Sequence, residues 1–248
     1  MPHLVSKHAY HYGIRDWPGF VAGLETLAQA VPLNDYCWCA DNLITYGRAI
    51  GFLADPLFAN AVNATNPSTK ERTIMWRTHV VTWAARQCLS LPGDFVEAGV
   101  YKGHTARVVC NYLDFGHQDR TYWLYDLFAE NPDQQRQLPG MGDELHREVV
   151  ARFADLANVK IVRGALPASF ADGMPEQVAF LHLDMNSADA EIGALDALWD
   201  RMPAGAIIIL DDFGWEVYAA QRRRETEWFG ARGKAVLELP TGQGMVIR

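Results

Sequence analysis

Acidic side chains at the ends of short apolar runs are the residues of this chain best suited to chemistry. Each of five acids stands at the end of a run of strand length: Glu97, Asp126, Asp184, Asp211 and Asp212. In an open parallel sheet the carboxyl ends of the strands share one edge, and ligands bind there. Acids gathered at such an edge repel one another and raise one another's pKa. We therefore expect a cation, or a set of hydrogen-bond donors, among them.

The segment from Glu97 to Thr105 predicts a sharp turn between a strand and a helix. Gly99 lets the chain leave the strand abruptly, and Gly103 lets the helix pack closely. The spacing is neither GxGxxG nor GxxxxGK[ST], so the dinucleotide fingerprint and the P-loop are both absent. An acid in place of a phosphate cradle suits a ligand with a positive group, and S-adenosylmethionine has an ammonium and a sulfonium. The alternative is a tight turn that binds nothing.

Two later segments could complete a nucleoside site. Asp126 follows the apolar run 122–125, and a carboxylate there can accept hydrogen bonds from ribose hydroxyls. We expect Phe128 to flank an adenine ring, with core packing as an equal alternative. Gly164 and Ala165, after a strand predicted over 159–162, offer backbone near the adenine edge.

The remaining acids favour a hard cation. Asp184 follows the run 178–183, while Asp211 and Asp212 follow the run 206–210, and these two strands are expected to be neighbours. Three carboxylates without a thiol or imidazole partner suit Mg²⁺ or Ca²⁺. The alternative is that Asp211 and Asp212 cap a turn while Asp184 binds the cofactor. His182, two residues before Asp184, is interpreted as a packed core histidine in preference to a catalytic base.

Alternating strands and helices over residues 92–248 predict an α/β fold. Strands are expected at 95–97, 122–126, 159–162, 178–183 and 206–210, with helices at 104–113, 145–156, 192–202 and 216–229 between or after them. Such alternation gives a doubly wound, mostly parallel sheet. Residues 235–247 read as a closing hairpin. Residues 1–91 show helical patterns and no predicted strand, so we expect an N-terminal helical extension. We expect this extension to cover the pocket of the molecule that is modified, called the acceptor site below.

The composition excludes several other classes. Among 248 residues, 22 are basic and 30 acidic, a net charge of −8 without a dense basic stripe, which argues against a nucleic-acid partner. No apolar run reaches the ~18 residues that span a bilayer, and the first residues lack a signal-peptide pattern. We therefore expect no membrane partner and a cytoplasmic location. The cysteines lack zinc-site spacing and are expected to be buried thiols: Cys37, Cys39, Cys88 and Cys110.

Residues 94–213 resemble the macrocin O-methyltransferase family, metal-dependent sugar O-methyltransferases. The segment 93–103 looks like that family's pattern GD-hydrophobic-VE-x-GV-x-x-G, and Val159–Gly164 with the Leu166-Pro167 that follows is similar to its third-strand block. Asp184 and Asp211-Asp212 match its metal aspartates. Two departures concern the acceptor: the family's DGD reads Asp184-Met185-Asn186, and its Asp-Ser-Phe reads Asp126-Leu127-Phe128.

The resemblance implies a class I, Rossmann-like methyltransferase fold with a seven-stranded sheet in residues 92–248. It implies S-adenosylmethionine and Mg²⁺ as cofactors, a saccharide or glycoside hydroxyl as acceptor, and natural-product biosynthesis as the setting; a homo-oligomer is left open. Asp184 is the expected catalytic base. The metal ligands are Asp184, Asp211 and Asp212, and the cofactor residues are Glu97, Gly99, Val100, Tyr101, Gly103, Thr105, Asp126, Phe128, Gly164 and Ala165.

Three rival functions share parts of this pattern. A catechol-type O-methyltransferase would use the same sheet and metal with an aromatic diol. A nicotinamide-dependent oxidoreductase would share the layout, but the missing glycine of GxGxxG disfavours it. A non-catalytic nucleoside-binding protein is the third.

Overall fold

The chain folds into two compact units, Met1–His79 and Val80–Arg248. We describe each by itself, from a computed structural model that covers residues 11–31, 37–129, 140 and 142–248. The division falls twelve residues before the boundary expected at residue 91. The predicted role of the N-terminal part as an acceptor-site cover remains a prediction.

The first unit contains a β-hairpin that the sequence did not predict. Strand β1 (Cys37–Ala40) pairs antiparallel with β2 (Leu43–Tyr46), so the expectation of an all-helical N-terminal part was wrong. The turn consists of Asp41 and Asn42, with φ of 55° and 56°. Two successive positive φ angles are typical of a type I′ turn, whose twist matches that of paired strands.

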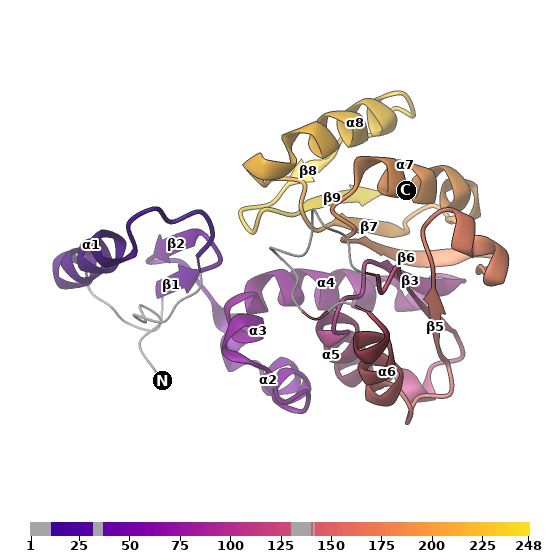
Figure 1. The fold of residues 1–248 in the computed structure, drawn as a ribbon, viewed down its shortest axis with the longest axis horizontal. Coiled ribbons are helices and arrows are strands. Elements are labelled where there is room, and N and C mark those ends of the chain that lie inside the picture. The colour runs from indigo at the N-terminus through magenta and orange to yellow at the C-terminus, as the bar shows by residue number, and fades with distance from the viewer. Residues whose placement is uncertain (1–10, 32–36, 130–139, 141) are drawn as a thin grey trace. The chain divides into compact units, whose positions relative to one another are not determined.

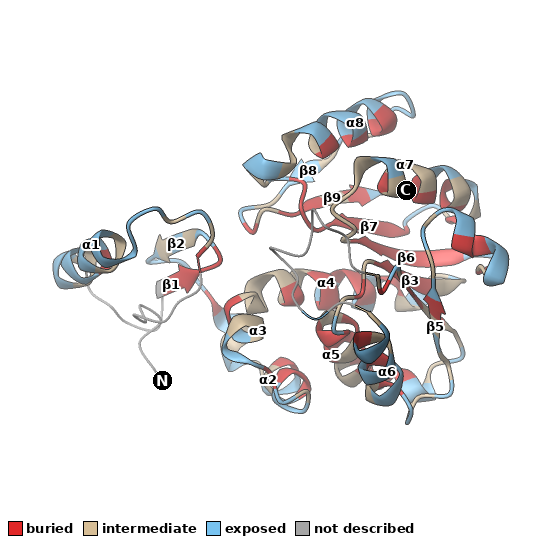
Figure 2. Cartoon of the chain, viewed as in Figure 1, coloured by how far each residue is buried: buried red, intermediate tan, exposed pale blue. Residues whose placement is uncertain are grey.

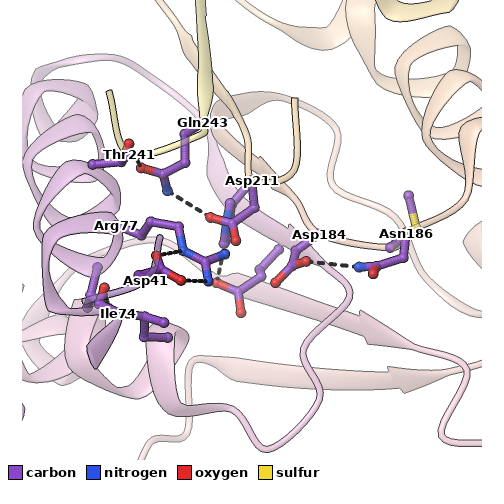
Figure 3. A network of polar contacts seen from close by, with 12 residues as sticks. Asp41, Ile74, Arg77, Asp184, Asn186, Asp211, Thr241 and Gln243 are labelled. Atoms are coloured by element: carbon purple, nitrogen blue, oxygen red, sulfur yellow. Dashed lines mark hydrogen bonds and ion pairs between the residues drawn. The ribbon is translucent and has the colours of Figure 1, made fainter. Parts of the chain in front are cut away.

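Helices surround this hairpin in sequence. They are α1 (Trp17–Ala30), the 3₁₀ turn η1 (Gly51–Ala54), α2 (Pro56–Asn63), α3 (Thr69–Thr73) and α4 (Met75–Gln87), which runs across the boundary between the units. Trp38 is 1 % exposed and packs edge-on against Trp76 at 5.6 Å between ring centroids. Arg77 donates from Nε and Nη2 to the two oxygens of Asp41 at 2.7 and 3.0 Å, which ties the hairpin turn to α4 (Figure 3).

The second unit is built on a seven-stranded, mostly parallel sheet (Figure 1). Its strands are β3 (Asp94–Ala98), β4 (Tyr122–Asp126), β5 (Val159–Arg163), β6 (Val178–Leu183), β7 (Ile207–Leu210), β8 (Leu237–Glu238) and β9 (Gly244–Ile247). The order is β5-β4-β3-β6-β7-β9-β8, and β3 to β7 are parallel, whereas β9 is antiparallel to β7 and β8. The predicted fold class is thus confirmed, and the strand order reverses direction between β3 and β6.

Helices cover both faces of this sheet (Figure 1). They are α5 (His104–Leu113), α6 (Asp143–Arg152), α7 (Ala188–Leu198) and α8 (Ala219–Gly230), joined by the 3₁₀ turns η2 (Cys88–Ser90), η3 (Phe115–His117), η4 (Ala168–Asp172), η5 (Trp199–Arg201) and η6 (Glu216–Tyr218). One core cluster joins side chains of α4, α5 and α6 to the sheet, and the other joins α7 and α8 to it. Because both faces are covered, β6 and β7 are buried along their whole length (Figure 2).

The described cysteines agree with the expectation of buried thiols. Cys39, Cys88 and Cys110 are buried and form no disulfide. Burial raises the pKa of the Cys88 thiol to about 11, so this group stays protonated at neutral pH. Within the described residues no helix has the length and apolar character needed to cross a membrane.

Candidate functional site

The acids predicted at the strand ends are brought to one edge of the sheet. Asp126 ends β4, while Asp184 and Asp211 directly follow β6 and β7. Backbone hydrogen bonds hold these ends in line: Asp184 N donates to Ala98 O at 2.8 Å, and Asp211 N donates to Leu183 O at 2.9 Å. The edge includes the reversal point between β3 and β6, where ligands of doubly wound sheets bind.

Gly99 allows the two strands on either side of that reversal point to approach closely. Its φ is +89°, and a Cβ there would lie 1.9 Å from the carbonyl oxygen of Asp184. No other residue fits this position without moving β6 away. The glycine turn and the first predicted metal ligand are therefore direct neighbours.

Asp126 holds the glycine turn in place. Its Oδ2 accepts hydrogen bonds from the backbone N–H groups of Val100 and Tyr101 at 2.8 and 2.7 Å, and its Oδ1 accepts from Phe128 N at 2.7 Å. A carboxylate has about four acceptor positions. With three of them taken by backbone, Asp126 has room for roughly one further donor, such as a ribose hydroxyl.

The other predicted cofactor residues fall into two groups. Gly103 caps α5 with φ +71°, and Thr105 lies half-buried in the first turn of that helix. Gly164 N donates to Asp126 O at 2.9 Å, which places Gly164 and the exposed Ala165 at the end of β5 beside Asp126.

Phe128 departs from the predicted site. Its side chain is 0 % exposed and packs against His146, at 4.9 Å between ring centroids. The core-packing alternative therefore describes Phe128, and the expectation that it flanks an adenine ring is corrected, because the buried ring has no open face.

The three predicted metal ligands form a compact acidic cluster, defined here as Asp184, Asp211 and Asp212. One carboxylate oxygen of each lies within 4.8 Å of the other two. Asp211 and Asp212 are buried, at 6 and 7 % exposure, and Asp184 is half-buried. Three hard oxygen donors this close together fit a divalent cation such as Mg²⁺, which would also offset their mutual repulsion.

A buried polar row connects this cluster to β3. His182 is 2 % exposed, with Nδ1 3.1 Å from Glu97 Oε2 and Nε2 3.4 Å from Asp211 Oδ1. The hydroxyl of Tyr122 donates to Glu97 Oε2 at 3.1 Å. Glu97 is itself 2 % exposed, so this carboxylate lies inside the sheet edge, and its predicted contact with the cofactor stays a prediction.

The same row sets the charge of His182. Burial lowers the pKa of the ring, but hydrogen bonds to Asp211 and Glu97 outweigh it and raise the pKa to about 10. Both ring nitrogens are thus engaged by carboxylate oxygens. This geometry agrees with the interpretation of His182 as a packed core residue.

Four residues of the site were missed as candidates by sequence reasoning or noted only in passing. Gln243 Nε2 donates to Asp211 Oδ1 at 2.7 Å, and Asn186 Nδ2 donates to Asp184 Oδ1 at 3.3 Å (Figure 3). Thr241 donates to Gln243, and Tyr218 donates to Asn186. Only Asn186 had a sequence signal, as a departure from an acidic motif.

Comparison with known proteins identifies the relatives of this chain. The family model described as macrocin-O-methyltransferase matches residues 79–229, which is more than half of the chain. No curated protein sequence matches this chain.

Solved structures share the fold at low sequence identity. The O-methyltransferase NovP is 18 % identical, with a TM-score of 0.56 over 70 % of this chain and 80 % of NovP. The calicheamicin methyltransferase CalS11 is 15 % identical, with a TM-score of 0.53 over 77 and 91 %. The O-methyltransferase TomG from Streptomyces achromogenes, solved with S-adenosylmethionine, is 13 % identical, with a TM-score of 0.51 over 78 and 88 %.

Proposed function

The chain belongs to the macrocin O-methyltransferase family, and from that premise we propose a metal-assisted methyl transfer from S-adenosylmethionine to a hydroxyl of a sugar or glycoside. Membership makes the chain an S-adenosylmethionine-dependent O-methyltransferase. The observation that carries the rest is the contact between the glycine turn and the acidic cluster: Gly99 lies directly against Asp184. Cofactor and acceptor can therefore meet at one edge of the sheet.

The cofactor site is assigned to the turn after β3 and the ends of β4 and β5. Its members are Glu97, Gly99, Val100, Tyr101, Gly103, Thr105, Asp126, Gly164 and Ala165. Asp126 supports this assignment because it is half-buried and fixes the turn through two backbone N–H groups.

The acidic cluster would hold a divalent cation. When bound, such a cation supplies a Lewis acid that lowers the pKa of the acceptor hydroxyl and orients it. The donor set supports Mg²⁺, because all three ligands are carboxylate oxygens.

Asp184 is the proposed base. The acceptor oxygen attacks the methyl carbon, the bond from that carbon to sulfur breaks, and its electron pair returns to sulfur. Asp184 takes the hydroxyl proton, and the fold holds oxygen, carbon and sulfur in line. His182 is a poorer candidate because both ring nitrogens already face carboxylates.

The identity of the acceptor is drawn from the family and from one relative's name. CalS11 is named a TDP-rhamnose 3′-O-methyltransferase, which supports nucleotide-linked sugars as the first acceptors to try. The covering role of residues 1–91, the cytoplasmic location and a homo-oligomer are proposals that rest on the sequence alone.

The test is an acceptor screen with S-adenosylmethionine labelled in its methyl group. We expect label in nucleotide-linked sugars or glycosides, turnover lost after exhaustive chelation, and recovery when Mg²⁺ is added back. The exposed Asp119→Asn serves as a control for Asp212→Asn, which should lose the response to Mg²⁺. Label in catechols but in no sugar would select the catechol-type alternative, and full turnover after chelation would exclude a metal role.

A further inference from the structure

Two amide side chains reach the acidic cluster from different segments of the second unit. Gln243, in the turn between β8 and β9, donates to Asp211 Oδ1 at 2.7 Å. Asn186, in the loop after β6, donates to Asp184 Oδ1 at 3.3 Å. Figure 3 shows both amides pointing at their carboxylates. Two of the three carboxylates of the acidic cluster, Asp211 and Asp184, thus receive an amide N–H at Oδ1.

Each amide is itself held by a hydroxyl. Thr241 Oγ1 donates to Gln243 Oε1 at 2.8 Å, and the Tyr218 hydroxyl donates to Asn186 Oδ1. An amide side chain has one accepting end and one donating end. Because the hydroxyl fixes the accepting end, the donating NH₂ group must face the carboxylate. The site therefore contains two hydrogen-bond chains of the same kind, each running from a hydroxyl through an amide to a carboxylate.

Burial restricts the hydrogen-bond chain Thr241–Gln243–Asp211 to one arrangement. Gln243 is 0 % exposed, and Thr241 and Asp211 are each 6 % exposed. Water has little access to these groups, so a lost hydrogen bond there is poorly replaced. His182 Nε2 also lies 3.4 Å from the same oxygen, Asp211 Oδ1, which adds a second partner to the fixed end of the carboxylate.

We propose that Gln243 and Asn186 are positioning residues of the metal site, which set the rotation of Asp211 and Asp184 before a cation binds. This inference rests on the proposed function, because it assigns the acidic cluster as the metal site. A carboxylate ligand rotates about its Cβ–Cγ bond, and a donor on one oxygen fixes which oxygen faces the cation; partners of this kind tune metal affinity. A carboxylate in place of the Asn186 amide could not donate, so the amide is what supplies the N–H to Asp184.

The experiment measures metal binding directly, without turnover. Gln243→Leu removes one donor at similar size. Asn186→Gly removes the other without backbone strain, because Asn186 has φ +56° and glycine adopts that angle readily. Gln221→Leu is the matched control: Gln221 is 4 % exposed, and neither of its amide atoms has a hydrogen-bond partner among the described residues. Chelator-treated proteins are titrated with Mn²⁺ by electron paramagnetic resonance and with S-adenosylmethionine by calorimetry.

We expect Gln243→Leu and Asn186→Gly each to weaken Mn²⁺ binding roughly 10–100-fold, with S-adenosylmethionine affinity within twofold of the native protein. Gln221→Leu should bind Mn²⁺ as the native protein does. Thermal unfolding followed by circular dichroism confirms that each variant is folded. If Gln243→Leu does not fold, Thr241→Val is used in its place. This variant keeps the Gln243 amide but removes the hydroxyl that orients it. We then expect a smaller loss of Mn²⁺ affinity.

A fourth variant distinguishes a failure of this proposal from a failure of the proposed metal site on which it rests. Asp212→Asn removes a ligand and should lose Mn²⁺ affinity outright. If it binds Mn²⁺ normally, the metal site itself is wrongly placed. If it loses Mn²⁺ while Asn186→Gly and the Gln243 or Thr241 variant retain native affinity, the metal site stands and the positioning role is overturned.

Discussion

Asp126 is the residue of the proposed cofactor site with the most backbone contacts. Its two oxygens accept three backbone N–H groups, two from the glycine turn and one from its own loop. Because hydrogen bonds to a charged acceptor are strong, the carboxylate fixes the turn after β3 against the end of β4. Its importance is therefore twofold: it shapes the turn, and its remaining capacity suits a ribose hydroxyl.

Asp126→Ala should weaken S-adenosylmethionine binding by roughly 1–3 kcal/mol, the cost of losing hydrogen bonds to a charged group. Isothermal calorimetry with the native protein and the variant measures it. Asp119→Ala removes an exposed acid of the same unit and should leave binding unchanged. Undiminished affinity in Asp126→Ala would remove this residue from the cofactor site.

The convergence of the acidic cluster could be predicted from the sequence, because it depends only on strand ends sharing an edge. Each of the three acids follows a run of apolar residues, and the parallel pairing of β6 with β7 brings together Asp184, Asp211 and Asp212. Gln243 and Tyr218 could not be found in this way. They arrive from β8–β9 and η6, segments whose spatial neighbours are set by tertiary packing and not by local pattern.

At the scale of elements, the contact between α7 and α8 contains an unusual pair of buried acids. Glu191 on α7 and Glu225 on α8 are both 0 % exposed. Burial raises the pKa of Glu191 well above its usual range, and the neighbouring Glu225 carboxyl raises it further. Burial also raises the pKa of Glu225. The pair is therefore favoured while protonated and costs stability when charged.

This pair predicts a pH dependence of stability. Both folded-state pKa values lie above the unfolded value of about 4.3, so the folded chain binds more protons than the unfolded chain between the two. Stability from these groups is present below the unfolded pKa and is lost as pH rises through the folded pKa. Glu225→Gln removes one of the two carboxyls that would ionise, and with it part of the stability lost at high pH. The Tm of the variant should therefore exceed that of the native protein by more at pH 8 than at pH 5.

The expected gain at pH 8 is on the order of 1–3 kcal/mol, the cost of an unsatisfied buried group, and about 2–4 °C in Tm per kcal/mol for a domain of this size. Calorimetric scans at the two pH values check it. Glu227→Gln, on the exposed side of the same helix, is the control. A gain that is equal at both pH values, or larger at pH 5, would contradict the protonated pair.

Regular elements were predicted best where one pattern dominates. The helix His104–Leu113 and the strand Val178–Leu183 have the ends expected from the sequence. The hairpin Cys37–Tyr46 was missed because each of its strands has only four residues. Its one signal was Asp41-Asn42, two residues that tolerate positive φ and suit a two-residue turn.

At the scale of the whole molecule, the alternation of strands and helices predicts the fold class. Because the strand order runs in opposite directions from β3, right-handed crossovers place helices on both faces of the sheet. The division into units after His79 could not be predicted, because α4 continues across the boundary without a break. The match of a family model to residues 79–229 covers mainly the second unit. We therefore propose that the residues of methyl transfer lie in the second unit, Val80–Arg248.

The most direct test of the account is the rate of methyl transfer by Asp184→Asn, measured under saturating Mg²⁺ with an acceptor found in the screen. Asp184 is proposed both to bind the cation and to take the proton. The account predicts that kcat falls by at least ~10²–10⁴, the contribution of a general base, while S-adenosylmethionine affinity stays within twofold. His182→Gln, measured beside it as folded protein, should retain far more turnover. If Asp184→Asn stays active and His182→Gln is inactive, the assignment of the base is contradicted.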